Sequence, residues 1–510
     1  MRSIILAAAA ALAVAAPAAA QGAPAAACVG GSAGEFACNA VDLLANFTPQ
    51  ELGGPPAGGC GSYPNLCANE VWGWTDPDSG KEYAVQGLAN GVAFVDVSDP
   101  SAPVFLGRMP QPPGVNLSTW HSLKVYANHA FVGSEASGHG VQVFDLTRLR
   151  GLTGPPQTFT ADARYTGNSN AHTIDINEDA GFLYIAGGTQ TNSADCHGGG
   201  LHIVDISTPT SPAYAGCFDS VGYTHEAQCI TYDGPDATYV GRQICAAYNQ
   251  SHVAFVDVTN PAAPTLISSV SYPNTGYTHQ GWFTEDRRYI LVDDEFDTAS
   301  PGTRTIVIDV ADLDDPEFAF NYYGPLATYA HNLYIRGNYA FLSNYQGGLH
   351  ILDLAGIDSG QLTEVAYFDT YPLGNGLSYA GQWGNYPYFA SGTVLASDGR
   401  FGLFVLRPTG IATAGAPPPP PTEGFTLSAP APNPAFDEVR LTLTVAEAQH
   451  VRAEAFDAMG RRVSVLHDGN VGVGATAALT LDAGALPAGP YLIRVTGETF
   501  SATSRVALAR

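Results

Sequence analysis

Five histidines recur at a nearly constant interval, each at the start of a segment rich in β-forming residues. They are His121, His172, His225, His279 and His331, with successive spacings of 51, 53, 54 and 52 residues. Neutral imidazoles that converge on one axis can hold a transition metal ion. The alternative is a structural role, because a residue repeated in every unit commonly meets a repeated backbone requirement. The sequence leaves both interpretations open and predicts that the five side chains lie around one mouth of a central channel.

An acidic run occurs only once in the chain. Asp293, Asp294, Glu295 and Asp297 place four carboxylates within five residues. Carboxylate oxygens are ligands for hard cations such as Ca²⁺ or Mg²⁺, so the run predicts a metal site on the same face as the histidines. The alternative is a solvated acidic loop on an acidic protein. The expected cofactor is therefore a divalent cation, either calcium or a transition metal, whose identity the sequence does not give.

Motifs for nucleophilic catalysis are missing from the sequence. There is no G-x-S-x-G elbow, and no lone cysteine stands ready to act with a histidine. The glycines at 198–200 lead into a strand instead of a helix, so they do not form a phosphate-binding loop. No catalytic residue is assigned.

An internal repeat predicts the elements that position these residues. A small turn, five or six β-forming residues and an aspartate recur, as in GVAFVD ending at Asp96 and GLHIVD ending at Asp205. The marker positions are 96, 145, 205, 257, 309, 353 and 406, with Leu406 in place of the last aspartate. A repeat of 44 to 60 residues has the size of one four-stranded propeller blade. The histidine rhythm extends to Asn69 and Gly381, which gives seven blades over residues 69–408.

The two landmarks of each blade should lie at opposite ends, because the first and third strands of a four-stranded meander run in the same direction. The marker aspartates precede turns in which a carboxylate can accept the N–H two residues on, so we expect a structural role for them. Residues 157–164 are expected to form the fourth strand of the second blade. The seventh blade lacks a fourth strand, and residues 41–47 of the N-terminal segment 21–68 are predicted to close the ring beside 401–406.

The composition indicates an exported protein. The chain has 510 residues, a formal net charge of −26 and only two lysines, which disfavours nucleic acid as a partner. Residues 1–20 have a short basic start, an apolar stretch and an A-x-A site, as expected of a signal peptide. No later segment is apolar enough to span a membrane.

Eight cysteines follow the signal peptide, which fits an oxidising compartment. Their proximity in sequence suggests the pairs Cys28 with Cys38, Cys60 with Cys67, Cys196 with Cys217 and Cys229 with Cys245. Eight cysteines allow 105 pairings, so the grouping is a prediction from spacing alone. No C-x-x-C motif points to redox chemistry.

The marker strands resemble the LVIVD repeat, and residues 69–408 resemble the propeller of the choice-of-anchor B family. This resemblance implies a secreted or surface location and no established reaction. Beyond a proline-rich linker at 409–423, three motifs resemble the type A sorting domain of the type IX secretion system: APNPAF at 431–436, DAMGR at 457–461 and LPAGPYLIRV at 486–495. The match over 424–510 implies a small β-sandwich, the type IX machinery as partner, and export through the periplasm to the cell surface or beyond.

Two classes of function follow. The first is a binding or adhesion module for an extracellular ligand, with or without a cation. The alternative is a metal-dependent extracellular hydrolase or lyase that uses the histidines and carboxylates at the channel mouth. Propellers support both classes, so the fold does not decide between them.

Overall fold

A computed structural model describes residues 24–188, 196, 199–297, 301–411 and, towards the C-terminus, 425–427, 435, 438–445, 448–457, 461–472, 476–484, 486–497 and 501–508. It divides into two compact units, Met1–Ala416 and Pro417–Arg510. The expected signal peptide and residues 412–423 of the expected linker lie outside the described residues, as do most of the APNPAF and DAMGR motifs. The regular secondary structure of the described part is almost entirely β-strand, with short 3₁₀ helices at η1 (Leu146–Leu149) and η3 (Ile357–Ser359). None of these residues forms a helix of the length and hydrophobicity that crossing a membrane requires.

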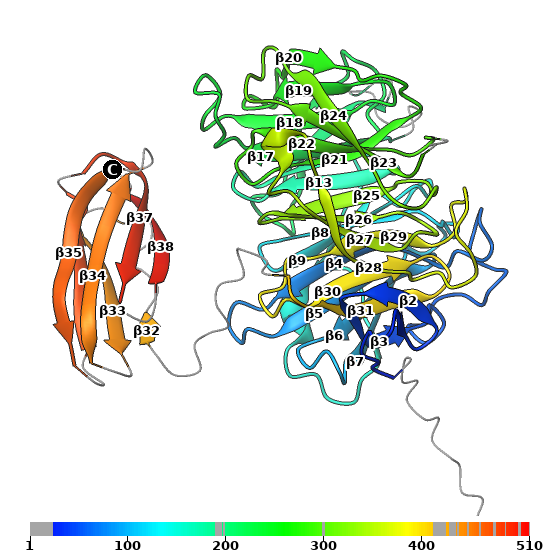
Figure 1. Ribbon diagram of the computed structural model, residues 1–510, viewed down its shortest axis with the longest axis horizontal. Coiled ribbons are helices and arrows are strands. Elements are labelled where there is room, and N and C mark those ends of the chain that lie inside the picture. The colour runs from blue at the N-terminus through cyan, green and yellow to red at the C-terminus, as the bar shows by residue number, and fades with distance from the viewer. Residues whose placement is uncertain are drawn as a thin grey trace, which may run out of the picture. The chain divides into compact units, whose positions relative to one another are not determined.

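The described residues of the first unit form seven sheets that are built mainly from consecutive antiparallel strands (Figure 1). The first three sheets comprise β4 (Ala68–Thr75), β5 (Glu82–Leu88), β6 (Gly91–Asp96) and β7 (Val104–Pro110); β8 (His121–Tyr126), β9 (His129–Ser134), β10 (Val141–Asp145) and β12 (Ala163–Tyr165); and β13 (Thr173–Asn177), β14 (Phe182–Ala186), β15 (Leu201–Asp205) and β16 (Ala213–Phe218). The next two comprise β17 (Glu226–Thr231), β18 (Gln243–Tyr248), β19 (Val253–Asp257) and β20 (Thr265–Val270); and β21 (Thr278–Phe283), β22 (Tyr289–Asp294), β23 (Arg304–Asp309) and β24 (Glu317–Tyr323). The last two comprise β25 (Asn332–Arg336), β26 (Tyr339–Ser343), β27 (Leu349–Asp353) and β28 (Thr363–Phe368); and β29 (Gln382–Tyr386), β30 (Val394–Asp398) and β31 (Gly402–Pro408) with β3 (Val41–Phe47).

The first strands of the seven sheets contact one another in sequence order, and β29 of the last sheet also contacts β4 of the first. Each sheet therefore packs between two neighbours, and its strands contribute to two apolar layers. In β19, Val253 and Phe255 face the fifth sheet, while Ala254 and Val256 face the third. This follows from the two-residue period of a strand, which sends alternate side chains to opposite faces. It also explains why the marker strands read as continuous apolar runs.

N-terminal residues complete two of the sheets. β3 pairs antiparallel with β31, from Val41 opposite Pro408 to Phe47 opposite Leu403. β2 (Phe36–Asn39) pairs with β28, and the two-residue β1 (Ser32–Ala33) pairs with β2. Figure 1 shows these blue strands beside the yellow ones of the last two sheets. An outer edge that would otherwise expose unpaired N–H and C=O groups is thereby covered.

The second sheet differs from the expectation of one strand over 157–164. β11 (Gln157–Thr158) instead pairs in parallel with β7 of the first sheet, and only β12 pairs with β10. Between them, Phe159 packs in the apolar layer of Phe94 and Phe144, and Asp162 accepts the backbone N–H of Asp145. The close approach of β11 requires Gly107, whose φ is +141° and where a Cβ would lie 2.1 Å from the Gln157 carbonyl oxygen. Side-chain packing therefore splits the segment between two sheets.

All four disulfides that the sequence spacing suggested are present: Cys28–Cys38, Cys60–Cys67, Cys196–Cys217 and Cys229–Cys245. Cys229 and Cys245 are directly opposed on β17 and β18, so their disulfide links two neighbouring strands. The Cys60–Cys67 bond closes a short loop before β4.

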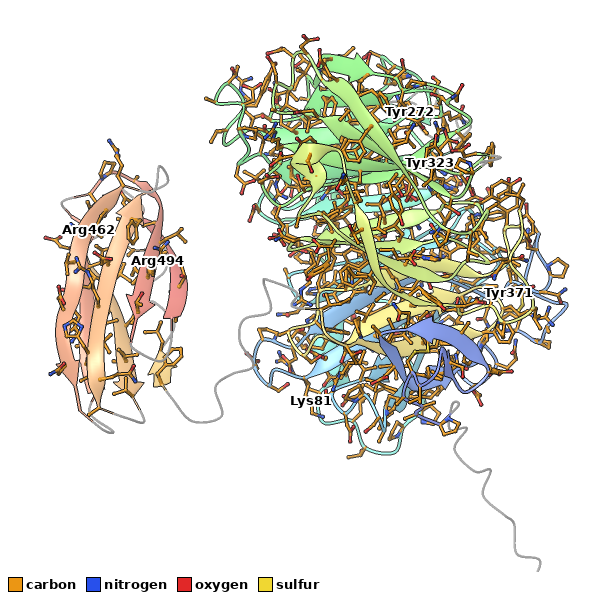
Figure 2. The ribbon with its side chains drawn as sticks, in the orientation of Figure 1. Lys81, Tyr272, Tyr323, Tyr371, Arg462 and Arg494 are labelled. Atoms are coloured by element: carbon orange, nitrogen blue, oxygen red, sulfur yellow. A yellow bond between two sulfur atoms is a disulfide. The ribbon has the colours of Figure 1, made fainter. Side chains whose placement is uncertain are left out.

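In the second unit, the residues that the structure describes form two sheets. One comprises β32 (Phe425–Leu427), β33 (Glu438–Val445) and β36 (Thr476–Asp482), and the other β35 (Arg462–Val471), β34 (Gln449–Asp457), β37 (Gly489–Thr496) and β38 (Ser501–Leu508). Alternate apolar residues of both sheets, such as Leu441 and Ile493, share one buried core. Arg462 and Arg494, labelled in Figure 2, are exposed.

Candidate metal centre

Four of the five repeated histidines line one pocket of about 300 Å³ in the first unit. They are His172, His225, His279 and His331, contributed by the third to sixth sheets. The backbone N–H groups of His172, His225 and His331 donate to the second strand of their own sheets, at the carbonyls of Ala186, Tyr248 and Ser343. The backbone thus meets the repeated structural requirement, which any residue except proline could satisfy. The imidazole rings are left to make other contacts.

The rings converge in a row. His172 Nε2 lies 2.9 Å from His225 Nε2, and ring centroids are 4.5 Å apart for His225 and His279 and 4.6 Å apart for His279 and His331. Among the described residues of this pocket, two groups have ligand atoms within 4.8 Å of one another: His172, His225 and His279, and His279, Glu295 and His331. His279 belongs to both groups. This is the density of nitrogen and oxygen donors that a first-row transition metal requires.

Partners at the outer ring nitrogens orient the histidines. His172 Nδ1 lies 2.6 Å from Glu135 Oε1, and His331 Nδ1 lies 2.5 Å from the Trp383 carbonyl oxygen. A carboxylate and a carbonyl only accept hydrogen bonds, so these two Nδ1 atoms carry the proton in the neutral ring and each Nε2 has a free lone pair. Metal-binding histidines are typically fixed in this way by a carboxylate or a carbonyl. Hydroxyl groups hold His225 Nδ1, from Tyr277 at 2.9 Å and Tyr223 at 3.1 Å.

Burial keeps the imidazoles of His225, His279 and His331 neutral. Desolvation lowers the pKa of His225 and His279 well below the ordinary value and that of His331 to about 3. The neutral ring is the form that binds metal. Burial also raises the pKa of Glu295 to about 7, and Tyr345 donates to its Oε1 at 2.6 Å while Oε2 lies 3.7 Å from His279 Nε2. A cation would supply the positive charge that this carboxylate lacks among its described neighbours.

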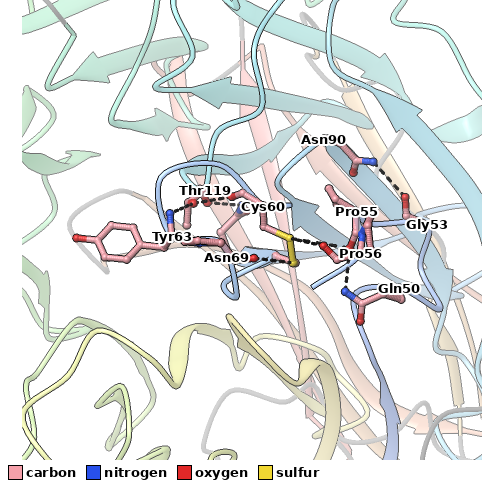
Figure 3. Close-up of a disulfide and its surroundings, with 11 residues drawn as sticks. Gln50, Gly53, Pro55, Pro56, Cys60, Tyr63, Asn69, Asn90 and Thr119 are labelled. Carbon is pink, nitrogen blue, oxygen red and sulfur yellow. Dashed lines mark hydrogen bonds between the residues drawn. A yellow bond between two sulfur atoms is a disulfide. The ribbon is translucent and has the colours of Figure 1, made fainter. Parts of the chain in front are cut away.

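The fifth histidine lies outside the pocket. His121 is 2% exposed and contacts Asn69 and the His139 ring, while Trp120 lines the pocket on this side. The loop closed by Cys60–Cys67 is held at the start of the second sheet, where the Thr119 hydroxyl donates to the Cys60 carbonyl at 2.8 Å (Figure 3). Tyr63 of this loop packs against Trp120 with ring centroids 5.3 Å apart. On this side the pocket is therefore lined by Tyr63 and Trp120 instead of by His121. The repeat alone does not reveal this, because Tyr63 lies in a loop that precedes it.

The acidic run divides in three. Only Glu295 reaches the pocket. Asp294 forms an ion pair with Arg304 at 3.3 Å and accepts the N–H groups of Gly276 and Tyr277, and Asp297 also pairs with Arg304. Asp293 is 1% exposed and has no hydrogen-bond partner. The run is therefore largely buried instead of a solvated loop, and a guanidinium group supplies part of the positive charge that the sequence pattern requires.

Aromatic side chains complete the pocket, and the sequence interpretation had missed them. Its lining includes Tyr63, Trp120, Tyr277, Phe296, Tyr345, Tyr379 and Trp383. The sequence offered a signal for only one of them: a tyrosine stands two residues before His225, His279 and His331, and of these three tyrosines Tyr277 lines the pocket. No lysine or arginine is among the lining residues that the structure describes.

Comparisons with known proteins support the repeat. Residues 83–110, 194–220, 244–271 and 327–370 match the model of the LVIVD repeat, and these segments contain β6, β15, β19 and β27. No curated protein matches the chain. The chain therefore contains LVIVD repeats in an all-β, β-propeller-like arrangement.

Two solved structures are similar to this chain. One is the extracellular domain of a putative one-component system from B. thetaiotaomicron, with 12% identity, a TM-score of 0.41, and coverage of 91% of this chain and 60% of that one. The other is the computationally designed protein Ika8, with 10% identity, a TM-score of 0.40, and coverage of 66% and 82%. The chain thus spans about 60% of the length of the first of these structures.

Proposed function

We propose that this protein is an exported seven-bladed β-propeller that binds a transition metal ion at the mouth of its channel and uses the ion on an extracellular substrate. The convergence of four imidazoles, with two Nε2 atoms 2.9 Å apart, is the observation that carries this proposal. Two ring nitrogens at that distance need either a shared proton or a shared metal ion. The Glu135 and Trp383 contacts leave lone pairs on the Nε2 atoms of His172 and His331, so both imidazoles could bind a metal ion without losing a proton.

The site fits a catalytic metal better than a structural one. Structural zinc sites are closed by four protein ligands, whereas catalytic sites keep an open position. Here the ligand groups line an open pocket of about 300 Å³ with a largely aromatic wall. Glu295 stands beside the histidines and could hold the metal or move a proton during hydrolysis or elimination. We therefore favour a metal-dependent hydrolase or lyase that acts on an uncharged or cation-bearing substrate.

Metal titration of the purified mature protein tests the proposal. Co²⁺ should bind near one equivalent and give visible absorption bands typical of nitrogen coordination. Azide should then change those bands by entering an open coordination position. Absence of stoichiometric Co²⁺ or Zn²⁺ binding would refute the metal site. Binding without any response to azide would refute the open, catalytic form of it.

The second candidate is a binding or adhesion module without chemistry. Two aromatic residues of the rim favour it, because Tyr63 is 40% exposed and Phe296 is 44% exposed. Exposed aromatic rings next to a pocket are typical ligand-binding surfaces. Retention of ligand by the metal-free protein, with no turnover after metal loading, would support this candidate over the first.

The cellular route is also a proposal. The LVIVD repeats and four disulfides agree with the choice-of-anchor B resemblance and an extracellular location. We infer that residues 1–20 direct export to the periplasm and that residues 424–510 form a β-sandwich recognised by the type IX machinery. A reporter that carries residues 1–20 at its N-terminus and residues 409–510 at its C-terminus should then leave the cell only when that machinery is intact, and should stay in the periplasm when residues 409–510 are removed.

A further inference from the structure

The layer between the fifth and sixth sheets departs from the repeat at one pair of residues. In other sheets the residue four positions before the marker aspartate is apolar, buried and paired with the second strand, as in Val92 opposite Gly87, Val253 opposite Tyr248 and Leu349 opposite Ser343. In the fifth sheet this pair is Thr305 opposite Asp293. Both lie on the face that packs towards the sixth sheet, as their neighbours Val307 and Leu291 do. A carboxylate here is not required by the fold.

Several oxygen atoms in this layer have no hydrogen-bond partner. They are both carboxylate oxygens of Asp293, the hydroxyl of Thr305 and the side-chain carbonyl of Asn344. The three residues are only 1%, 1% and 5% exposed. Thr305 and Asp293 are directly opposed, and such residues have Cβ atoms about 4.5–5.5 Å apart, so both side chains extend from neighbouring points on the same face of the sheet. Thr305 and Asn344 also line one cavity of about 10 Å³, which is room for one water-sized particle.

No positive side chain among the described neighbours serves Asp293. Arg304 precedes Thr305 in sequence, but it is occupied by Asp294, Asp297 and the carbonyls of Pro273 and Asn274. His350 lines the cavity, yet its Nδ1 contacts Glu364 at 2.7 Å and its Nε2 contacts the Gly347 carbonyl at 3.1 Å. A buried carboxylate without a partner is strongly disfavoured.

We propose that a single hard cation, Na⁺ or Ca²⁺, binds between the fifth and sixth sheets, with Asp293, Thr305 and Asn344 as its side-chain ligands. All three side chains offer oxygen ligands, which Na⁺ and Ca²⁺ prefer. A transition metal would instead prefer the imidazole nitrogens of the pocket. The site is independent of the proposed function. Asp293 stands two residues before Glu295, so the ion fixes the end of β22 from which the pocket carboxylate extends.

The thermal stability of the full chain tests this site. Cation-depleted protein is kept in choline chloride, and NaCl or millimolar CaCl₂ is added at constant ionic strength. Wild type should gain about 5 °C in Tm with at least one of the two cations, because binding to the folded state alone stabilises it. Asp293→Asn should gain nothing from either salt. The salt that acts identifies the ion.

Two matched variants separate this site from others. Asp312→Asn alters the exposed group of Asp236, Asp312 and Asp314, and His279→Ala alters the pocket; both should keep the full cation response. If Asp293→Asn does not fold, Thr305→Val should weaken the cation affinity about 10-fold in equilibrium dialysis with radioactive Na⁺ or Ca²⁺. A wild type that responds to neither cation would overturn the proposal. So would an Asp293→Asn protein as stable without cation as wild type is with it, which would indicate a protonated carboxyl group.

Discussion

The residues that recur at the two ends of the sheets make different kinds of contact. At one end, the marker aspartates of the first six sheets each accept the backbone N–H two residues on, at 2.8–3.0 Å in every case. At the other end, the histidines meet different partners: a carboxylate for His172, hydroxyls for His225 and a carbonyl for His331. A repeated residue with the same local bond in every copy is structural. We infer that a repeated residue whose partners come from other sheets is a candidate for a binding site.

The largest effect should come from removing the histidine that belongs to both ligand groups. His279→Ala should weaken Co²⁺ or Zn²⁺ binding by more than about 100-fold, measured by titration calorimetry. His121→Ala is the matched control, because His121 occupies the equivalent place in the second sheet and is equally buried but lies outside the pocket. Equal loss of metal in both variants would break the distinction between site and scaffold.

The Glu135 contact sharpens the comparison, because it acts through His172 and not on the metal itself. Glu135→Ala should weaken metal binding by about 10- to 100-fold, the usual cost of losing a partner that orients a ligand. Glu135→Gln keeps an oxygen acceptor for Nδ1–H and should recover much of the affinity. The same titration measures both, and an Ala variant with wild-type affinity would contradict the role assigned to this carboxylate.

Asp398 tests whether a residue that accepts hydrogen bonds from nearby backbone groups has a structural role at the histidine end of the sheets as well. It is buried at the end of β30 and accepts the N–H groups of Arg400 and Phe401 at 2.8 Å. Burial raises its pKa from 3.8 to about 7, so the folded state holds the proton more tightly than the unfolded state. Its contribution to stability is therefore present below pH 3.8 and is lost as the pH rises towards 7.

Asp398→Asn should accordingly flatten the fall in unfolding free energy between about pH 4 and pH 7, by on the order of 1 kcal/mol for each unit of the raised pKa. Urea unfolding at several pH values measures this slope. Metal affinity at neutral pH should not change. A variant with the wild-type slope would show that another buried carboxylate dominates.

The smallest effect is expected from a single marker aspartate. Asp205→Ala removes the hydrogen bond from the Ser207 N–H at 2.9 Å and should cost about 1 kcal/mol of unfolding free energy, with metal affinity unchanged. Urea denaturation and Co²⁺ titration check both parts. A loss of metal binding would mean that the two ends of the sheet are coupled.

Much of the fold was predictable because its determinants are local and repeated. The marker strands, the four disulfide pairs and the β3–β31 pairing follow from spacing, β-forming residues and the need to cover a sheet edge. The division of residues 157–164 between two sheets was not predictable, because it depends on Phe159 packing in an apolar layer formed by residues of both sheets. The exclusion of His121 from the pocket was not predictable either. It depends on the loop closed by Cys60–Cys67, which precedes the repeat and packs Tyr63 against Trp120.

The sequence by itself determined which residues could form a site: the period placed five imidazoles at equivalent strand starts, and the acidic run stood out as something the repeat did not need. Only the tertiary structure decided which of them meet and in what chemical state. Arg304 takes Asp294 and Asp297 and leaves Glu295 to the pocket, while Glu135 and Trp383 turn two imidazoles inward. Spacing along the chain fixes where a strand begins. Burial and partners from other sheets fix the charge and direction of a side chain, and these exist only once the sheets have packed.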